Sequence, residues 1–224
     1  MTSNTVFIKT YPAPRFNIDE ILRYAGCKDT KDEFLPLIEE CIKECDSLLS
    51  YKVCYGIFPI KTDGNGIRFT FASEKSSLLS RKLAGCDCAL VFGATIGIEI
   101  DRLIAKYGRI SPSKALFFQA LGAERIESLC NAFCDDIQTT IQPDGLFLQH
   151  RFSPGYGDFP LSFQKEIFRV LDCHRKIGLS LNESLLMSPS KSVTAIAGIS
   201  RKICKTGTKN CGSCNKTDCL FKKM

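Results

Sequence analysis

The segment RFSPGY, which begins at Arg151, combines side chains that could bind a small polar ligand. The guanidinium of Arg151 is planar and forked, which suits a carboxylate. Gly155 lets a ligand approach the backbone closely, and Tyr156 offers an aromatic face to a sulfonium or a heteroaromatic ring. Because proline and glycine also make ordinary turns, the segment alone indicates either a binding loop or a structural turn.

Four cysteines near the C-terminus could hold a metal. They are Cys204, Cys211, Cys214 and Cys219. Four thiolates this close in sequence can surround a tetrahedral metal or an iron–sulfur cluster. Their spacing matches neither the paired C-x2-C of zinc ribbons nor the C-x2-C-x2-C run of bacterial ferredoxins. An iron–sulfur cluster, a zinc ion and a metal-free reduced tail therefore stay open as interpretations.

The overall composition indicates a folded cytoplasmic protein. The 224 residues are 44% hydrophobic and 24% charged, which is typical of a globular chain. The sequence has neither an apolar run of the roughly 18 residues that a membrane helix needs nor a secretory signal at its start. The 13 cysteines are an odd number, which favours reduced thiols over a disulfide framework. We therefore expect no membrane partner.

The net charge of +6 belongs to the tail. Residues from Arg201 onward hold seven of the 30 basic residues and one of the 24 acidic residues, so the first 200 residues carry 23 of each. A generally basic surface is excluded, and nucleic acid is not an expected partner of the main domain. We expect a single domain over residues 1–200, followed by a basic, cysteine-rich tail over 201–224.

Strands and helices alternate along the chain. The patterns predict strands over 5–10, 53–60, 67–71, 89–91, 146–152 and 192–199, and helices over 19–24, 32–49, 73–84, 98–107 and 162–176. The turn KTDGNG joins 53–60 and 67–71 as an antiparallel hairpin, which favours an α+β fold over a parallel sheet.

The clearest predicted helix begins at Ser111-Pro112. Serine as the cap and proline in the first turn form a helix-start signal, because the first-turn N–H groups have no partners within the helix. Positions 118, 122, 126, 129, 133 and 137 are mostly apolar and line one face, while positions 124, 127, 128, 131, 135 and 138 are polar and line another. We expect this to be the core helix of the domain.

Two blocks of the sequence resemble the activation domain of cobalamin-dependent methionine synthase, in particular its free-standing subunit form. The first runs from GATIGIEIDRL through RFSPGYGDFP and carries the R-x-x-x-G-Y element of the family as Arg151, Gly155 and Tyr156. The second, ESLLMSPSKSV at 183–193, is similar to the closing segment of the family. The resemblance extends from about Asn17 to Ser200.

The resemblance implies a twisted antiparallel sheet with flanking helices and a binding site for S-adenosylmethionine. By this analogy Arg151 holds the methionine carboxylate, the backbone around Ser153 and Gly155 meets the adenine, and Tyr156 lines the pocket. The family presents S-adenosylmethionine to inactive cobalamin held by the cobalamin-binding module of methionine synthase. An electron from flavodoxin or ferredoxin gives cob(I)alamin, which takes the methyl group and becomes methylcobalamin. The implied role is that of an accessory subunit of a methyltransferase in methionine biosynthesis, without catalytic side chains of its own.

This sequence departs from the family at three places. Asn131 stands where the family has a ligand-facing Glu on the helix, so the predicted contact keeps a hydrogen-bond acceptor but loses a charge. An acidic contact near the N-terminus corresponds to Asp19, for which a helix cap is an equal interpretation. A Tyr contributed by the last hairpin of the family has no counterpart after Ile199. Corrinoid-binding domains carry a D-x-H-x-x-G motif, and the similar segment Asp172–Gly178 of this chain has one residue too many before its glycine, so we expect cobalamin to reside on the partner.

Two other interpretations stay open at this level. The chain could activate a different corrinoid methyltransferase, with an iron–sulfur cluster on the four tail cysteines as its redox centre. Alternatively, the basic cysteine tail could belong to a non-enzymatic regulator that binds metal or RNA.

Overall fold

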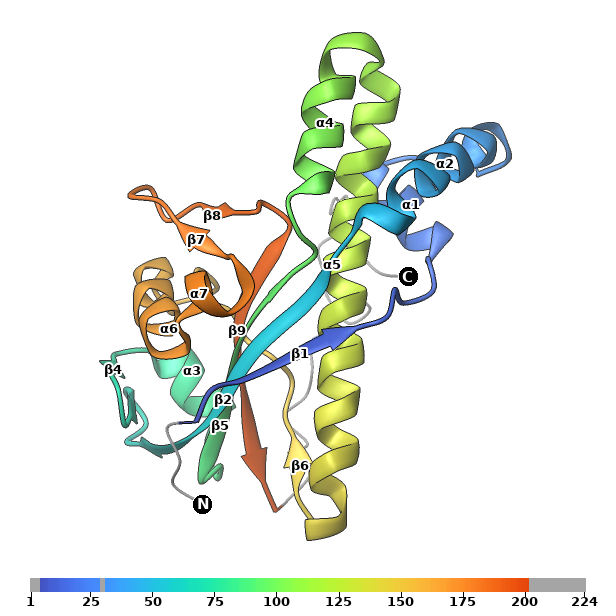
Figure 1. The fold of residues 1–224 in the computed structure, drawn as a ribbon. Coiled ribbons are helices and arrows are strands. Elements are labelled where there is room, and N and C mark those ends of the chain that lie inside the picture. Colours follow the sequence, from blue (N-terminus) through green and yellow to red (C-terminus); the bar gives the residue numbers. More distant parts are fainter. Residues whose placement is uncertain (1–4, 29–30, 202–224) are drawn as a thin grey trace.

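The structure of the protein is a computed structural model that describes residues 5–28 and 31–201. Its ribbon shows a curled sheet crossed by one long helix (Figure 1). The four tail cysteines named above lie outside the described residues, as does the predicted tail beyond Arg201. The domain boundary at residue 200 therefore stays a prediction.

The main sheet has seven strands, and every ladder between them is antiparallel. Its order is β4-β3-β2-β5-β9-β6, with β1 also paired to β2. The strands are β1 (Phe7–Tyr11), β2 (Tyr51–Thr62), β3 (Ile67–Phe69), β4 (Ser73–Glu74), β5 (Cys88–Thr95), β6 (Phe147–Leu148) and β9 (Ser192–Ser200). A separate ribbon joins β7 (Ser180–Leu181) to β8 (Met187–Ser188). The prediction of an α+β fold with a twisted antiparallel sheet and flanking helices is confirmed.

The long strand β2 explains the curl of the sheet. Its first half lies between β1 and β5, whereas Ile60–Thr62 leaves β5 and pairs with β3. The predicted hairpin over these two strands is confirmed. Its turn is fixed by the carboxylate of Asp63, whose Oδ1 accepts hydrogen bonds from the N–H groups of Asn65 and Gly66.

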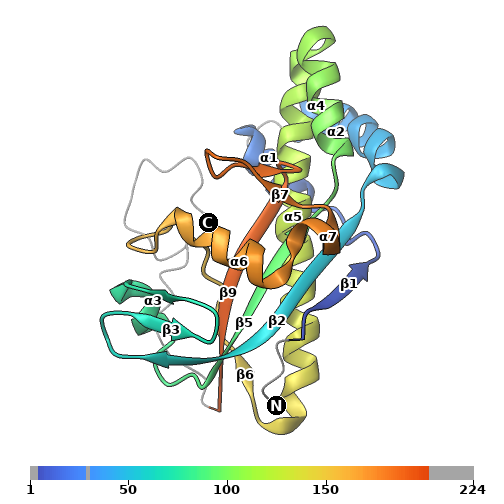
Figure 2. The ribbon, with the colours of Figure 1, turned by 60° about the vertical axis from the view of Figure 1, so that its left-hand side comes forward.

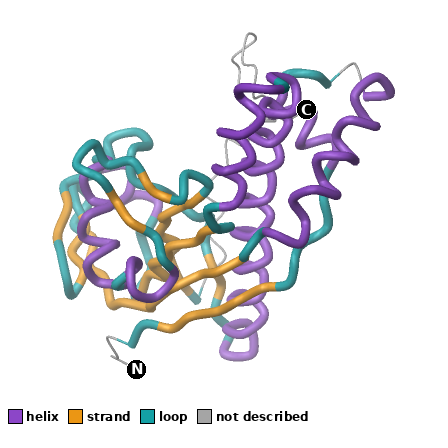
Figure 3. The backbone as a smooth tube through the Cα atoms, turned by 45° about the horizontal axis from the view of Figure 1, so that its top comes forward, coloured by secondary structure: helices purple, strands orange, loops and turns teal. Residues whose placement is uncertain are grey.

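Four helices lie on one side of the sheet (Figures 1 and 3). They are α1 (Ile18–Ala25), α2 (Lys31–Cys45), α4 (Glu99–Ile110) and α5 (Pro112–Ile141), with short 3-10 turns at Asp46–Leu48 and Gln142–Asp144. Helix α5 crosses the strands, and α1, α2 and α4 pack against α5. Alternate residues of β5 and β9, such as Leu90, Phe92 and Ala195, point toward these helices and join one buried core. The apolar stripe predicted for α5 lies in this core through Phe118, Leu129, Phe133 and Ile137.

Three short helices cover the opposite face (Figure 2). They are α3 (Ser77–Lys82), α6 (Gln164–Leu171) and α7 (Cys173–Ile177), and a 3-10 turn at Leu161–Phe163 precedes α6. The residues of β5 and β9 that alternate with the first set, such as Val91 and Ile196, pack here with Phe58, Phe69 and Phe163. The sheet therefore separates two hydrophobic cores.

Three details of the sequence-based prediction are wrong. The helix expected over 162–176 is divided at Asp172, whose backbone takes a left-handed conformation with φ of 50°. The helix expected over 73–84 begins as strand β4, and α3 starts only at Ser77. The strand expected over 146–152 covers only Phe147–Leu148. By contrast, Ser111 is the N-cap of α5 with Pro112 in the first turn, as predicted, although its side chain makes no capping hydrogen bond. Within the described ranges, no helix is long and apolar enough to cross a membrane.

Candidate functional site

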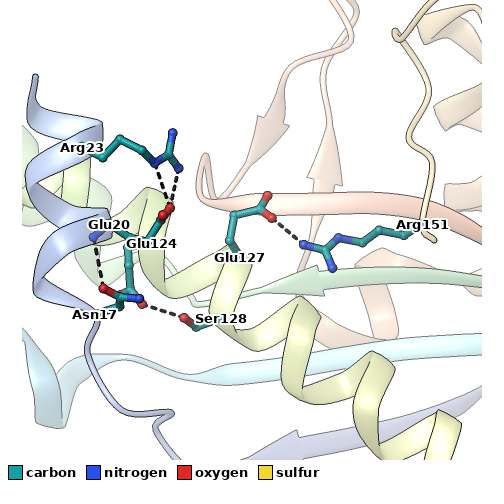
Figure 4. A network of polar contacts seen from close by, with 7 residues as sticks. All are labelled: Asn17, Glu20, Arg23, Glu124, Glu127, Ser128 and Arg151. Atoms are coloured by element: carbon teal, nitrogen blue, oxygen red, sulfur yellow. Dashed lines mark hydrogen bonds and ion pairs between the residues drawn. The ribbon is translucent and has the colours of Figure 1, made fainter. Parts of the chain in front are cut away.

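A small polar cavity lies between α1, the middle of α5 and the segment that follows β6. Its volume is about 200 Å³. The residues that line it are polar, with one aromatic ring among them: Asn17, Glu20, Tyr24, Glu124, Glu127, Ser128, Asn131 and Arg151. Figure 4 shows several of these side chains pointing toward one another from the three segments. Two of them, Arg151 and Asn131, are among the ligand-binding residues predicted from the sequence.

The side chain of Arg151 spans from the sheet to α5. Its Nη1 donates to Oδ1 of Asn131 at 2.7 Å. Its Nη2 donates to Oε2 of Glu127 at 2.5 Å, the contact drawn in Figure 4. The next residue, Phe152, exchanges two backbone hydrogen bonds of 2.8 and 2.9 Å with Ile196 of β9. That bridge fixes the backbone at Arg151, so the guanidinium is held in one place against α5.

The surroundings of Arg151 keep it charged. Burial acts to lower the pKa of the guanidinium, but the charge of Glu127 and its hydrogen bond to the guanidinium raise that pKa above its ordinary value. Burial raises the pKa of the Cys130 thiol, so this cysteine stays neutral beside the arginine. Only 25% of the Arg151 side chain is exposed, which strengthens the attraction that a ligand carboxylate would feel.

Helix α1 supplies the second wall. Its N-cap is Asn17, whose Oδ1 accepts a hydrogen bond from the N–H of Glu20 at 3.1 Å. The carboxylate of Glu20 pairs with buried Arg23 through Nε at 2.9 Å and Nη2 at 2.5 Å. Burial, and then the charge of Glu127, raise the pKa of Tyr24, so its hydroxyl stays protonated and can donate a hydrogen bond.

The third carboxylate of the cavity is almost completely buried. Glu124 is 2% exposed and accepts two hydrogen bonds from its chain neighbour Arg125, at 2.5 and 2.6 Å. Its Oε1 also accepts from the hydroxyl of Ser128 at 2.6 Å. An unpaired carboxylate at this depth would carry a large desolvation cost, and these contacts offset it.

The three glutamates of the cavity therefore each have an arginine partner. Glu20 pairs with Arg23 and Glu124 with Arg125, both behind the wall, whereas Glu127 pairs with Arg151 inside the cavity. The Glu127 side chain is 43% exposed. A cavity that holds an arginine side by side with a partly exposed carboxylate is suited to a group that carries both charges, such as the ammonium and carboxylate of an amino acid.

The other predicted ligand residues lie outside this cavity. Ser153, Gly155 and Tyr156 follow Arg151 in a loop, where Ser153 is half-buried and the Tyr156 side chain is 67% exposed. Gly155 has φ of +93°, a conformation that favours glycine, and its N–H donates to the carbonyl of Phe159 at 2.8 Å. The structure thus separates the predicted set into a charged cavity and an adjacent aromatic loop.

The carboxylate of Asp158 ties this loop to α3. It accepts hydrogen bonds from the hydroxyl of Ser76 at 2.5 Å and from the N–H of Ser77 at 2.8 Å, and it also contacts the N–H of Leu78. The Ser76 hydroxyl, followed by these backbone donors, lowers the pKa of Asp158. The loop that carries Tyr156 is therefore held at both ends, by the Phe152 bridge and by Asp158.

Asp19 faces solvent. Its side chain is 79% exposed and forms an ion pair of 2.7 Å with Lys31, and it is not among the residues that line the cavity. The alternative interpretation of Asp19 as the helix cap is wrong, because α1 begins one residue earlier with Asn17 as its cap. The sequence signal for this start is N-x-x-E at Asn17–Glu20, which resembles a capping box.

The charge expected to be missing at Asn131 is supplied one helical turn earlier by Glu127. The polar stripe predicted on α5 contains Glu124, Glu127, Ser128 and Asn131, and all four line the cavity. The polar stripe on α5 was therefore the sequence pattern from which these four cavity residues could be predicted. In the part of the chain that the structure describes, no cluster of His, Cys, Asp or Glu is arranged to hold a metal ion.

The fold and the cavity together define an α+β domain with a small polar cavity between two helices and the segment that follows a strand. This is the fold of the methionine synthase reactivation domain. The chain is similar to the crystal structure of the MetH reactivation domain bound to AdoHcy, with a TM-score of 0.65 and 16% sequence identity over 87% of this chain and 78% of that chain. No protein-family model matches the chain, and no curated protein matches it in sequence.

Proposed function

We propose that the chain binds S-adenosylmethionine and presents it for the reactivation of cobalamin-dependent methionine synthase. The observation that carries the proposal is the pairing of Arg151 with Glu127 in a cavity of a domain with the reactivation fold. The neighbour of that fold was solved with AdoHcy, which has the same amino-acid and adenosine ends as S-adenosylmethionine.

The cavity fits the amino-acid end of this ligand. Its volume of about 200 Å³ is smaller than the ~300–1,000 Å³ of pockets that enclose a whole drug-sized molecule. The adenosine end would therefore lie beyond it. We place that end over the loop of Ser153, Gly155 and Tyr156, where Gly155 permits close backbone approach and Tyr156 offers an aromatic face.

Binding requires an exchange of ion pairs. The ligand carboxylate takes a place on the guanidinium of Arg151, where it competes with Oε2 of Glu127 and Oδ1 of Asn131. Glu127 then accepts a hydrogen bond from the ligand ammonium. Each of the two side chains exchanges its partner for an opposite charge of the ligand, so neither is left as a buried unpaired charge.

The residues of this chain bind and orient the ligand and need not move a proton. Cobalamin on the partner module, once reduced by one electron from flavodoxin or ferredoxin, would supply the nucleophile for the methyl group, and AdoHcy would be the leaving group that stays on this chain. The contribution of Arg151, Glu127 and the Tyr156 loop is to hold the methyl group where that nucleophile can reach it, which lowers the entropic part of the barrier. The partner is then the cobalamin-binding module of methionine synthase.

The first test measures binding by isothermal titration calorimetry with S-adenosylmethionine and AdoHcy. Arg151→Met should weaken both by about 10- to 100-fold, the effect of losing a hydrogen-bonded charge pair. Arg169→Met is the matched control, because Arg169 also pairs with a glutamate but lies exposed on α6. Equal affinities of wild type and Arg151→Met would place the ligand elsewhere.

The second test measures reactivation. The protein is mixed anaerobically with a methionine synthase that lacks its own reactivation module, together with a reductant and S-adenosylmethionine. We expect the absorbance of cob(II)alamin to give way to that of methylcobalamin with wild type and Arg169→Met, and not with Arg151→Met. Binding without reactivation would redirect the proposal to another corrinoid methyltransferase.

A further inference from the structure

Arg125 is buried more completely than its role in stability explains. Its side chain is 0% exposed, and it lies on α5 directly after Glu124. A buried ion pair is weak grounds for stability, because an apolar side chain of similar size often stabilises a core as well or better. The contacts of Arg125 therefore call for another explanation.

Those contacts connect both walls of the cavity. Nη1 of Arg125 donates to the carbonyl of Pro14 at 2.5 Å, and Nη2 donates to the carbonyl of Arg15 at 2.7 Å. The guanidinium carbon lies 3.9 Å from the ring centre of Phe16. On the other side, Nε and Nη2 hold the two oxygens of Glu124.

The segment Pro14–Phe16 leads directly into the cap of α1. Asn17 follows Phe16 and lines the cavity, and Glu20 and Tyr24 lie on the helix that it caps. The hydrogen bonds from Arg125 to the carbonyls of Pro14 and Arg15 consequently set the position of α1 relative to α5. Arg125 itself is not among the residues that line the cavity.

We propose that Arg125 is the positioning residue of the cavity. It fixes the carboxylate of Glu124 on one wall and the start of α1 on the other, and it does so without touching the ligand. The inference rests on the proposed function for the identity of the ligand only. The geometric statement, that Arg125 orders the residues before and within α1, is independent of which ligand binds.

The variants are Arg125→Met, which keeps the length of the side chain, and Arg125→Lys, which keeps the charge but cannot contact Glu124 and two carbonyls in the same fork geometry. The matched control is Ile137→Ala. Ile137 is buried in the same core on the same helix, and it lies 12 residues, or about 18 Å along the axis, from Arg125. All proteins are compared at the same interval below their own midpoints of thermal unfolding.

The first readout is the Kd for S-adenosylmethionine of the folded protein. We expect Arg125→Met to raise it by about 10- to 100-fold, as is typical when a residue behind a binding group is lost. Arg125→Lys should give a smaller increase, and Ile137→Ala should leave the Kd unchanged. If Arg125→Met and Ile137→Ala bind alike, the role of Arg125 is structural only and the proposal is overturned.

The second readout needs no ligand. Native-state hydrogen exchange should become faster over residues 14–25 in Arg125→Met while β5 keeps its protection, because the local tie is lost and the sheet is not. Uniform acceleration across the domain overturns the positioning role. If the wild type does not bind S-adenosylmethionine but hydrogen exchange over residues 14–25 is still faster in Arg125→Met, the proposed ligand is wrong and the positioning role of Arg125 is supported.

Should Arg125→Met fail to fold, Phe16→Leu takes its place in both measurements. That change removes the ring that lies beside the guanidinium and leaves its hydrogen bonds to Pro14, Arg15 and Glu124. We expect the same local pattern of exchange with a smaller rise in Kd. Unchanged exchange over residues 14–25 would contradict the proposal.

Discussion

Both faces of the sheet are covered by an apolar core, but only one of them also holds buried charged side chains among the described residues. On the face covered by α3, α6 and α7, five rings pack with centroids 4.9 to 6.3 Å apart: Phe58, Phe69, Phe71, Phe159 and Phe163. On the other face, α1 and α5 carry Arg23, Glu124 and Arg125, which are all the buried charged side chains of the described residues. Buried charge is costly, so its confinement to the neighbourhood of one cavity distinguishes the face on which we propose binding from a face that we expect to contribute stability alone.

The largest expected effect tests the stability side of this comparison. Ile167→Ala on α6 removes a side chain that is 0% exposed and should lower the free energy of unfolding by about 2–5 kcal/mol. The Kd of the protein that remains folded should not change. Denaturant unfolding and calorimetry measure the two quantities, and a coupled loss of affinity would show that the two faces are not independent.

Glu127→Gln tests the binding side. The change keeps the shape of the side chain but removes the charge that the ligand ammonium is proposed to meet, so we expect the Kd for S-adenosylmethionine to rise about tenfold. Stability should change little, since the Glu127 side chain is 43% exposed. Methylthioadenosine, which lacks the amino-acid end, serves as the control ligand. Its affinity should be the same for wild type and Glu127→Gln, and a parallel loss would place the amino acid elsewhere.

Asp158→Asn tests the loop between the two faces. Because its hydrogen bonds lower the pKa of Asp158 in the folded state, its contribution is present above the unfolded value of about 3.9 and is lost as the pH falls through the lowered folded pKa. The variant should melt slightly below wild type at neutral pH, and the difference should vanish in acid. Melting curves from pH 7 to pH 2 measure it. A difference that grows in acid would contradict the assignment.

The smallest expected effect concerns Asp19. Its pair with Lys31 is exposed, and such pairs contribute about 0–1 kcal/mol. Asp19→Asn should leave both stability and the Kd for S-adenosylmethionine close to wild type. A tenfold loss of affinity would restore Asp19 as a ligand contact and would extend the binding region past the cavity described above.

The fold could be predicted from the sequence wherever one pattern dominated. The KTDGNG turn fixed the hairpin, and helical periodicity identified α5 together with its polar stripe. The break at Asp172 could not be foreseen, because the sequence places neither glycine nor proline there and only packing on both sides requires a left-handed residue. For the site, Arg151 and Asn131 were found from the sequence. The cavity residues Asn17, Glu20 and Tyr24 of the α1 side were not predicted. Their contact with α5 joins segments about a hundred residues apart, and no local sequence pattern indicates such a contact.

The choice between Glu127 and Asn131 shows a second limit. Both belong to the same polar stripe, one turn apart, so periodicity alone places either of them opposite Arg151. The structure shows that the guanidinium reaches both. The polar stripe in the sequence therefore predicts which face of α5 lines the cavity. Which residue of that stripe pairs with Arg151 depends on where the distant segment after β6 places the arginine.

The position of β9 in the sheet determines when, during synthesis, the cavity of the chain can be completed. Although β9 is the last strand of the described residues, it lies inside the sheet between β5 and β6, and Phe152 beside Arg151 is bridged to it. Chains grow from the N-terminus, so both helical walls are complete while the anchor of Arg151 is still being made. A nascent chain released before residue 192 would leave one edge of β5 unpaired and would lack the bridge that holds Phe152, so we expect the proposed ligand to stabilise only the finished protein and not its earlier stages.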